Sequence, residues 1–443
     1  MPITSFPVEL VSKICTHRGM AALYALRLTC RSLFITTADA FRRRAFRRIS
    51  VLLTTDGIQR LSELSMQEGI REHVQILMVV PELLNGHYNA TYSDFRRWDC
   101  IQGALGRSRK EQDSEQVDGK AYNAVYKAAM ADHRHALTSV TSIILLQECI
   151  RRFVNLSSVS LEYCPAKATG DIICLGWRRL RAQLGFHPDF KRERFSHKRV
   201  AREHDLAFTL LAKALIASGR KVKRLSTCGT HCYGVGLGRL YLTPEEWASF
   251  LSCLQGLSRL HLCHESSAIS SHRQRQCDFL AAVAPSREIL RYQIGPYNSS
   301  IYREPRRVHG LFQGLPFQRL RVVRLRLIEL PIDSLKQFLR AVSSTLQILT
   351  LRAISLAEAD DPSGPLPQDM EETKRHWWRL LEFIRDELNL QYLALRKVMF
   401  RKNPLKIVDM SLTWGRYENN VGVFHHRRTG LSFQDWMNQL RLK

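Results

Sequence analysis

The feature that most constrains the fold is a six-residue pattern, apolar-x-x-apolar-x-apolar, which returns along most of the chain and is called the hexad below. Each hexad suits a short buried strand, because alternate residues of a strand point to the same face. Between Val222 and Leu346, successive hexads start 26 to 35 residues apart. The hexads start at Val74, Leu156, Val222, Leu257, Ile289, Leu320, Leu346 and Leu390, and the one at Val222 is the poorest because Thr227 takes its last apolar position.

Amphipathic stretches with helix-start signals lie between the hexads. Thr243-Pro244-Glu245-Glu246 opens one such stretch, and Asp333-Ser334 opens another. This alternation of strand and helix predicts the α/β class. It resembles the leucine-rich repeat family, which implies an irregular α/β solenoid, or horseshoe, with short parallel strands on its concave side. The chain lacks the Asn or Cys that usually follows the hexad in that family, and a generic α/β domain is the alternative.

Two segments near the N-terminus, 6–15 and 26–34, carry a second pattern. Pro7 suits the first turn of a helix, and Leu10 and Ile14 lie one helical turn apart beside it. A second helix is expected to carry Leu23, Leu26 and Cys30 on one face, and a third to carry Phe34, Ala38 and Phe41. Three such helices are too small to bury all their apolar residues, so a partner surface is expected.

This short N-terminal three-helix module resembles an F-box over about the first 46 residues, with Phe6 in place of the more usual Leu. The resemblance implies a non-catalytic substrate-receptor subunit of a Skp/cullin/F-box ubiquitin ligase, which binds a Skp-type adaptor and, through it, a cullin. The adaptor-binding residues that it implies are Pro7, Val8, Leu10, Ile14, Leu26, Cys30 and Leu33. The alternative is an ordinary helical hairpin packed on its own domain.

Charge is the other unusual property, since 66 Lys and Arg residues against 41 Asp and Glu residues give a net charge of +25. Fourteen basic residues and four acidic ones lie between Trp177 and Arg224. Such a stretch binds nucleic acid phosphates, attracts an acidic protein, or is a solvated surface. The alternative function is therefore a nucleic-acid-associated protein that binds phosphates through 177–224.

The variable positions of the hexads are also rich in arginine. If the hexads form one concave parallel sheet, residues such as Ser160, Thr350 and Ala394 project toward a partner. Four arginines then form a basic ladder suited to an acidic or phosphorylated protein target, with a solvated row as the alternative. These tentative target-binding residues are Arg324, Arg326, Arg352 and Arg396.

Three divisions of the chain are expected: the F-box-like module at 1–46, the repeat domain at 47–410 and a C-terminal cap at 411–443. Within the repeat domain, 103–119 is polar, and 357–372 is acidic and contains three prolines, so both are predicted to be mobile insertions.

Other function classes find little support in the sequence. No run of about 18 apolar residues exists to cross a bilayer, and no basic segment followed by an apolar one indicates secretion. Eleven scattered cysteines favour reduced thiols in the cytoplasm or nucleus. The soft ligands in 228–232, with Cys253, Cys263 and His264, do not have the spacing of a familiar zinc site. No cofactor, metal or catalytic residue is assigned, although an α/β enzyme with residues that converge from distant positions is a third possibility.

Overall fold

The chain folds into an α/β protein with mostly parallel strands, which confirms the predicted class. It forms two compact units, Met1–Arg220 and Lys221–Lys443, and the boundary lies inside the predicted repeat domain. The computed structural model describes residues 6–81, 119–161, 173–184, 197–227, 234–265, 273–295, 306–307, 312, 314–357, 370–396, 399–400, 403–404, 407–409, 421–425, 433–438 and 440–442.

The first unit begins with a module of four short helices: α1 (Val8–His17), α2 (Met20–Thr29), α3 (Arg31–Thr36) and α4 (Ala38–Ala45). The sequence predicts three helices, with Cys30 inside the second. In the structure Cys30 has an extended backbone and separates α2 from α3. Thr37 separates α3 from α4, and its hydroxyl donates to the carbonyl oxygen of Leu33. Apolar spacing does not reveal such breaks, because they depend on local backbone hydrogen bonds.

The sheet of the first unit has the strand order β3-β2-β1-β4, and every neighbouring pair is parallel. The register pairs Leu77 with Val159, as the predicted hexads require. Strand β1 holds a further hexad, which starts at Phe46 and is not among the predicted ones. The elements are β1 (Arg48–Leu52), α5 (Thr55–Met66), α6 (Glu68–Arg71), β2 (Ile76–Val80), α8 (Gly119–Thr138), α9 (Val140–Arg152), β3 (Ser158–Leu161), β4 (Ile173–Leu175), α10 (Trp177–Leu184) and α11 (His197–Ser218).

Strands β1, β2 and β3 are buried on both faces. Every residue of β3 is buried, and so is every residue of β1 and β2 after the first. Ser160 is 2% exposed, so the prediction that it projects toward a partner is wrong. The hexad specifies which residues face the helices, but it does not specify what covers the opposite face of the sheet.

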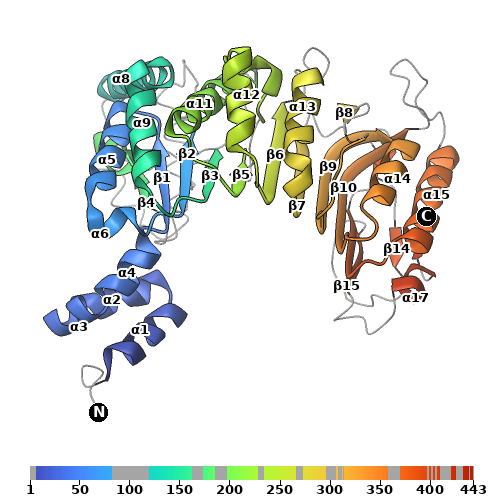
Figure 1. Ribbon diagram of the computed structural model, residues 1–443, viewed down its shortest axis with the longest axis horizontal. Coiled ribbons are helices and arrows are strands. Elements are labelled where there is room, and N and C mark those ends of the chain that lie inside the picture. Colours follow the sequence, from blue (N-terminus) through green and yellow to red (C-terminus); the bar gives the residue numbers. More distant parts are fainter. Residues whose placement is uncertain are drawn as a thin grey trace. The chain divides into compact units, whose positions relative to one another are not determined.

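The second unit alternates strand and helix in chain order, which the colour sequence in Figure 1 makes easy to follow. Its strands lie in the order β5-β6-β7-β9-β10-β11, and each pair is parallel. Helix α14 packs against β9, and α15 packs against β10. The elements are β5 (Arg224–Ser226), α12 (Pro244–Cys253), β6 (Arg259–Glu265), α13 (Arg273–Val283), β7 (Ile289–Gly295), β9 (Val322–Pro331), α14 (Ile332–Ala341), β10 (Ile348–Ala357), α15 (Met370–Glu387) and β11 (Tyr392–Arg396).

The predicted start of α12 is confirmed. The Thr243 hydroxyl accepts from the backbone N–H of Glu246, and the Glu246 carboxylate accepts from the backbone N–H of Thr243. This reciprocal cap satisfies two of the N–H groups that a helix start leaves without partners.

The register of the second sheet corrects one hexad. Leu290 of β7 pairs with Leu260 of β6 and with Val323 of β9, so the hexad in β7 starts at Arg287 and not at Ile289. Residues 290, 292 and 294 are all apolar, and a strand with an apolar residue at every second position fits two registers equally well. As a result Arg287 occupies a position that is Leu in the neighbouring hexads, and it is fully buried.

After the parallel strands, β15 pairs with β11 in the antiparallel direction.

The insertion predicted at 103–119 is described only at Gly119, which begins α8, and the one at 357–372 only at Ala357 and at 370–372 in α15. No described helix is long and apolar enough to span a bilayer. The remaining elements are η2 (Leu237–Arg239), η4 (Ala284–Ser286), β8 (Arg306–Arg307), β12 (Met399–Phe400), β13 (Asn403–Pro404), β14 (Ile407–Asp409), β15 (Val421–His425), α17 (Phe433–Asn438) and β16 (Leu440–Leu442).

Candidate functional site

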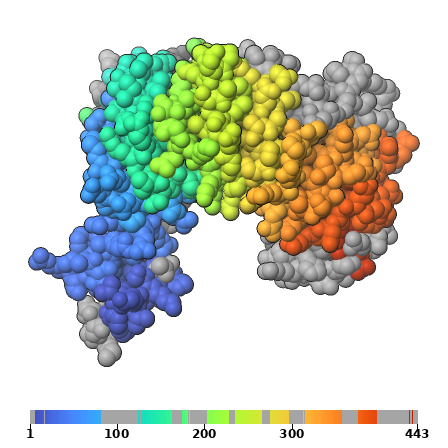
Figure 2. Space-filling model, in the orientation of Figure 1, coloured from blue at the N-terminus to red at the C-terminus, as the bar shows by residue number. Residues whose placement is uncertain are grey.

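The N-terminal module has a small apolar core of its own, and its atoms form one group in the darkest blue of Figure 2. Val11 and Cys15 lie one turn apart on α1 and face this core. Leu33, predicted to contact an adaptor, is only 3% exposed, so we withdraw it as a contact residue. The buried members of the core are Val11, Cys15, Met20, Leu23, Leu33 and Ala45.

Two arginines make contacts between the helices of the module. Arg44 of α4 donates to the carbonyl oxygens of Cys15 (3.3 Å) and Arg18 at the end of α1, where such oxygens have no partner inside the helix. Arg27 of α2 donates to the carbonyl oxygen of Phe34 at 3.0 Å. Its guanidinium carbon also lies 4.1 Å from the centre of the Phe34 ring and 4.4 Å from that of Phe41.

Several apolar residues of α1 to α3 stay exposed outside this core. Pro7, Val8 and Leu10 are exposed as predicted, and so is Cys30, whereas Ile14 and Leu26 are half-buried. Leu28, Phe34 and Ile35 are also exposed and were not predicted; Leu28 is 85% exposed and Ile35 is 62% exposed. Leu28 lies five residues after the buried Leu23, and Phe34 and Ile35 lie one and two residues after the buried Leu33. None of the three has the three- or four-residue spacing that would place it on the buried face.

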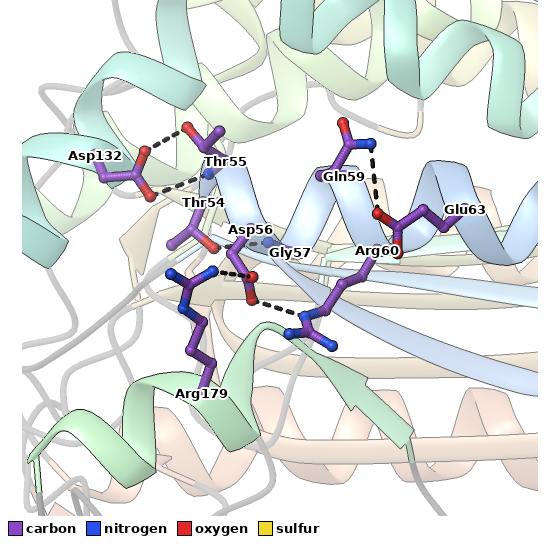
Figure 3. A network of polar contacts seen from close by, with 9 residues as sticks. All are labelled: Thr54, Thr55, Asp56, Gly57, Gln59, Arg60, Glu63, Asp132 and Arg179. Carbon is purple, nitrogen blue, oxygen red and sulfur yellow. Dashed lines mark hydrogen bonds and ion pairs between the residues drawn. The ribbon is translucent and has the colours of Figure 1, made fainter.

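A second group of polar residues lies where β1 leads into α5 (Figure 3). The Asp132 carboxylate of α8 accepts from the backbone N–H of Thr55 at 3.0 Å and from its hydroxyl. Thr54 accepts from the backbone N–H of Gly57 at 3.1 Å. A Cβ atom on Gly57 would lie 2.3 Å from the carbonyl oxygen of Leu52, so glycine is required there. The positive end of α5 is therefore already occupied by a carboxylate of the same unit.

The carboxylate of Asp56 extends this group. It accepts from Arg60 and from Arg179 of α10, both at 2.9 Å. Burial by itself would raise the pKa of Asp56, but these two hydrogen bonds outweigh it and lower the pKa below the usual range. Because every charge in this group has a partner, we interpret it as a structural link between α5, α8 and α10.

Some described residues of the basic stretch 177–224 make contacts within the fold. Arg179 pairs with Asp56, as described above. Arg220 donates to the carbonyl oxygens of Phe153 (2.9 Å) and Val154 (3.1 Å), just after α9. The segment from Glu203 to Asp205 of α11 is buried. Several residues of this stretch therefore serve the fold of the first unit.

The second unit has a half-buried sheet face that is rich in arginine. In β7 and β9 burial alternates, so that Leu290 and Val323 are buried while Arg291 and Arg324 are half-buried on the opposite face. The register places these two arginines side by side, next to His261 of β6.

The next row of the same face contains the predicted ladder. Arg326, Arg352 and Arg396 lie at one register position in β9, β10 and β11. Arg324 lies in the first row, where it pairs with Thr350 of β10, and Thr350 pairs with Ala394 of β11. Ala394 is fully buried, so the prediction that it projects outward is wrong. We call Arg291, Arg324, Arg326 and Arg352 the arginine quartet.

The pKa of His261 reflects the positive charge of this face. Partial burial lowers the pKa of its imidazole, and the neighbouring charges of Arg291, Arg324 and Arg259 lower it further, to about 3. The imidazole is therefore neutral at pH 7, and the region around it is strongly positive. Neither His261 nor Arg291 was predicted, although His261 occupies the same hexad position as Arg324.

Two unusual backbone conformations lie next to the quartet. Leu327 has φ 57° and Ala353 has φ 51°, and each directly follows an arginine of the ladder. Residues without glycine's freedom seldom adopt this region, and such strain is often retained at functional sites. The two residues occupy matching positions in β9 and β10 and pack against each other. Both strands are thus bent at the same place.

A metal centre is not part of either surface, since the described residues contain no group of three His, Cys, Asp or Glu side chains able to hold an ion. The cysteine-rich segment 228–232 lies outside the described residues. Comparison with known proteins adds no family, because no family model matches the sequence and no curated protein does. The two surfaces are therefore interpreted from their own residues and geometry.

Proposed function

We propose that this protein is a substrate-receptor subunit of a Skp/cullin/F-box ubiquitin ligase. The N-terminal module binds a Skp-type adaptor, and the repeat domain, an irregular leucine-rich-repeat-like solenoid, selects the target. The observation that carries the proposal is the set of exposed apolar residues on α1 to α3, in a module that has a buried core of its own.

The energetics favour a partner for these helices. Covering an exposed Leu or Phe side chain stabilises a complex by about 1.5–3 kcal/mol. A module of about 40 residues with six buried core residues buries little apolar surface of its own. An adaptor that covers α1 to α3 therefore also stabilises the module.

In this role the protein performs no chemistry of its own. It holds a target next to a ubiquitin-conjugating enzyme that the complex supplies, which raises the effective concentration of the attacking lysine. Neither surface needs a nucleophile or a general base for this function. What each one needs is complementary shape and charge.

The sharpest test introduces charge at two exposed positions of α1. In the double variant Val8→Asp and Leu10→Asp, binding to a purified Skp-type adaptor should weaken about 100-fold or more, because two carboxylates would be buried in an apolar contact. Both side chains lie outside the module's core, so the module should stay folded. Titration calorimetry measures the affinity, and circular dichroism checks the fold.

The matched control makes the same chemical change elsewhere in the first unit. Met66→Asp with Val154→Asp replaces two exposed apolar residues that lie outside the module. This control should bind the adaptor as the unmodified chain does. Equal adaptor binding by the α1 variant, or no adaptor binding by the unmodified chain, would contradict the proposal.

The nucleic-acid alternative makes a different prediction. If 177–224 bound phosphates, affinity for DNA or RNA would fall steeply with salt and would depend on its exposed residues, such as Lys221 and Lys223. Because Arg179 and Arg220 are used inside the first unit, this stretch offers fewer cations than its sequence indicates.

A further inference from the structure

Phe34 combines an exposed ring with a very short helix. Its side chain is 51% exposed. Helix α3 has six residues, of which Leu33 alone is buried, and a helix of this length is marginal by itself. Contacts from outside α3 are therefore needed if the Phe34 ring is to present one defined surface to a partner.

Arg27 of α2 supplies such contacts. Its Nη1 atom donates to the carbonyl oxygen of Phe34 at 3.0 Å and to the Thr37 hydroxyl at 3.4 Å. Its guanidinium carbon lies 4.1 Å from the centre of the Phe34 ring and 4.4 Å from that of Phe41. The Phe41 ring is itself held by an edge contact with Tyr24, at 5.2 Å between ring centres. Arg27 thus contacts both the backbone and the ring of Phe34.

These contacts use properties that are specific to arginine. A guanidinium is planar and delocalised, so it can lie against an aromatic ring while its N–H groups donate to nearby oxygens. The ammonium of a lysine is a compact charge on a flexible stem and does not combine the two contacts in one rigid group. The position of the Phe34 ring therefore depends on the residue type at position 27.

The surroundings of Phe34 indicate the chemistry of a matching partner surface. Leu28 and Ile35 are exposed apolar residues of the same two helices. Arg31 at the start of α3 is exposed as well, and the sequence contains no Asp or Glu between residues 10 and 38. A surface that complements this one is apolar opposite Phe34 and acidic around it, because opposite charges orient a partner and like charges exclude it.

We infer that Arg27 is a positioning residue for adaptor binding, which holds the Phe34 ring in one orientation so that the ring meets an apolar part of the adaptor with an acidic border. A ring that is ordered before binding costs less conformational entropy on association than a freely rotating one. That the partner is a Skp-type adaptor rests on the function proposed above, whereas the hold of Arg27 on Phe34 does not.

The test is a double-mutant cycle on the full chain, with the affinity for a purified Skp-type adaptor measured by titration calorimetry. Arg27→Lys keeps the charge but loses the planar group, and it should weaken binding about 10-fold. Phe34→Ala removes the ring and should weaken binding about 10- to 100-fold. If Arg27 acts through Phe34, adding Arg27→Lys to Phe34→Ala should cause no further loss. The matched control Arg43→Lys changes an exposed arginine of α4 that pairs with Asp39, and it should bind as the unmodified chain does.

A second readout does not need the adaptor. Incorporation of 4-fluorophenylalanine at position 34 places one fluorine on the ring, and its signal should move when Arg27→Lys removes the neighbouring guanidinium. The control Arg43→Lys should leave this signal unchanged. If Arg27→Lys does not fold, Phe34→Leu keeps an exposed apolar side chain without the ring, and it should bind the adaptor about 10-fold more weakly.

The acidic border of the partner is tested at Arg31. Arg31→Glu should slow association with the adaptor about 10-fold at low salt, and the difference from the unmodified chain should shrink as salt is added. An association rate that does not change would remove the acidic border from the inference.

Other outcomes would overturn the positioning role. Losses of affinity that add in the double variant would show that Arg27 acts independently of Phe34. Unchanged affinity in Arg27→Lys, or a loss that matches the unfolded fraction seen by circular dichroism, would restrict Arg27 to a contact within the fold. If the unmodified chain does not bind the adaptor, the proposed function fails, while the fluorine signal still decides whether Arg27 holds the ring, so the two proposals fail separately.

Discussion

Ser160 and Thr350 occupy the same position in their hexads, between the last two apolar residues, but they lie in different compact units. Ser160 in the first unit is buried with the rest of β3. Thr350 in the second unit is half-buried, on the face that carries the arginine quartet. The same local pattern thus yields strands buried on both faces in the first unit and strands with one half-buried face in the second.

The two units also differ in how their charged side chains are arranged. At the start of α5, Asp56 pairs with Arg60 and Arg179, and Asp132 accepts from Thr55, so each carboxylate has a partner inside the first unit. On the second sheet, guanidinium groups lie next to guanidinium groups, and a neighbouring imidazole is held neutral. Like charges in register by themselves destabilise a sheet slightly.

The largest effect expected from this comparison is at Ser160. Ser160→Arg should lower the free energy of unfolding by about 3–5 kcal/mol, because it places an unpaired cation in a covered sheet. Thr350→Arg should change it by about 1 kcal/mol or less, because its side chain can reach solvent. Urea denaturation of both variants measures the difference. Similar losses in the two variants would show that the second sheet is covered as well.

A smaller change in the free energy of unfolding, an increase instead of a decrease, is expected at Arg287. Its guanidinium makes one long hydrogen bond, 3.5 Å to the carbonyl oxygen of Val283, and its Nε and Nη1 atoms have no partner among the described residues. Burial lowers its pKa to about 9. Arg287→Leu restores the residue type of the neighbouring hexads and should raise the unfolding free energy by about 1–2 kcal/mol. Thermal denaturation tests this, and a lower stability would mean that Arg287 serves a partner within the fold.

The smallest effect is expected at Asp56. Because its folded pKa lies below its unfolded value of about 3.9, its contribution to stability is present above that pH and is lost as the pH falls toward the folded pKa. Asp56→Asn should therefore cost about 1 kcal/mol near pH 7, and the difference from the unmodified chain should shrink below about pH 4. Denaturation at several pH values measures this. A difference that does not change with pH would mean that charge is not its cause.

The hexads predicted the strands well where the apolar positions leave one choice of register. Leu349 and Leu393 lie at paired positions, as their hexads require, and Thr243 and Glu246 begin α12 as predicted. The hexad at Ile289 failed because three alternating apolar residues permit a slip of two. For the N-terminal module, helical spacing predicted that Leu10 would be exposed, but it could not place Leu33, whose burial depends on the three other helices.

The sequence by itself determined the alternation of strands and helices, because the spacing of apolar residues is a local property that each segment carries alone. It also placed Arg326, Arg352 and Arg396 at equivalent positions. Only the tertiary structure decided that His261 and Arg291 lie in register beside Arg324, and that β3 is buried on both faces while β7 has one half-buried face. These facts depend on which strands become neighbours and on what packs over each face. Such contacts join residues far apart in the chain, and no short stretch of sequence records them.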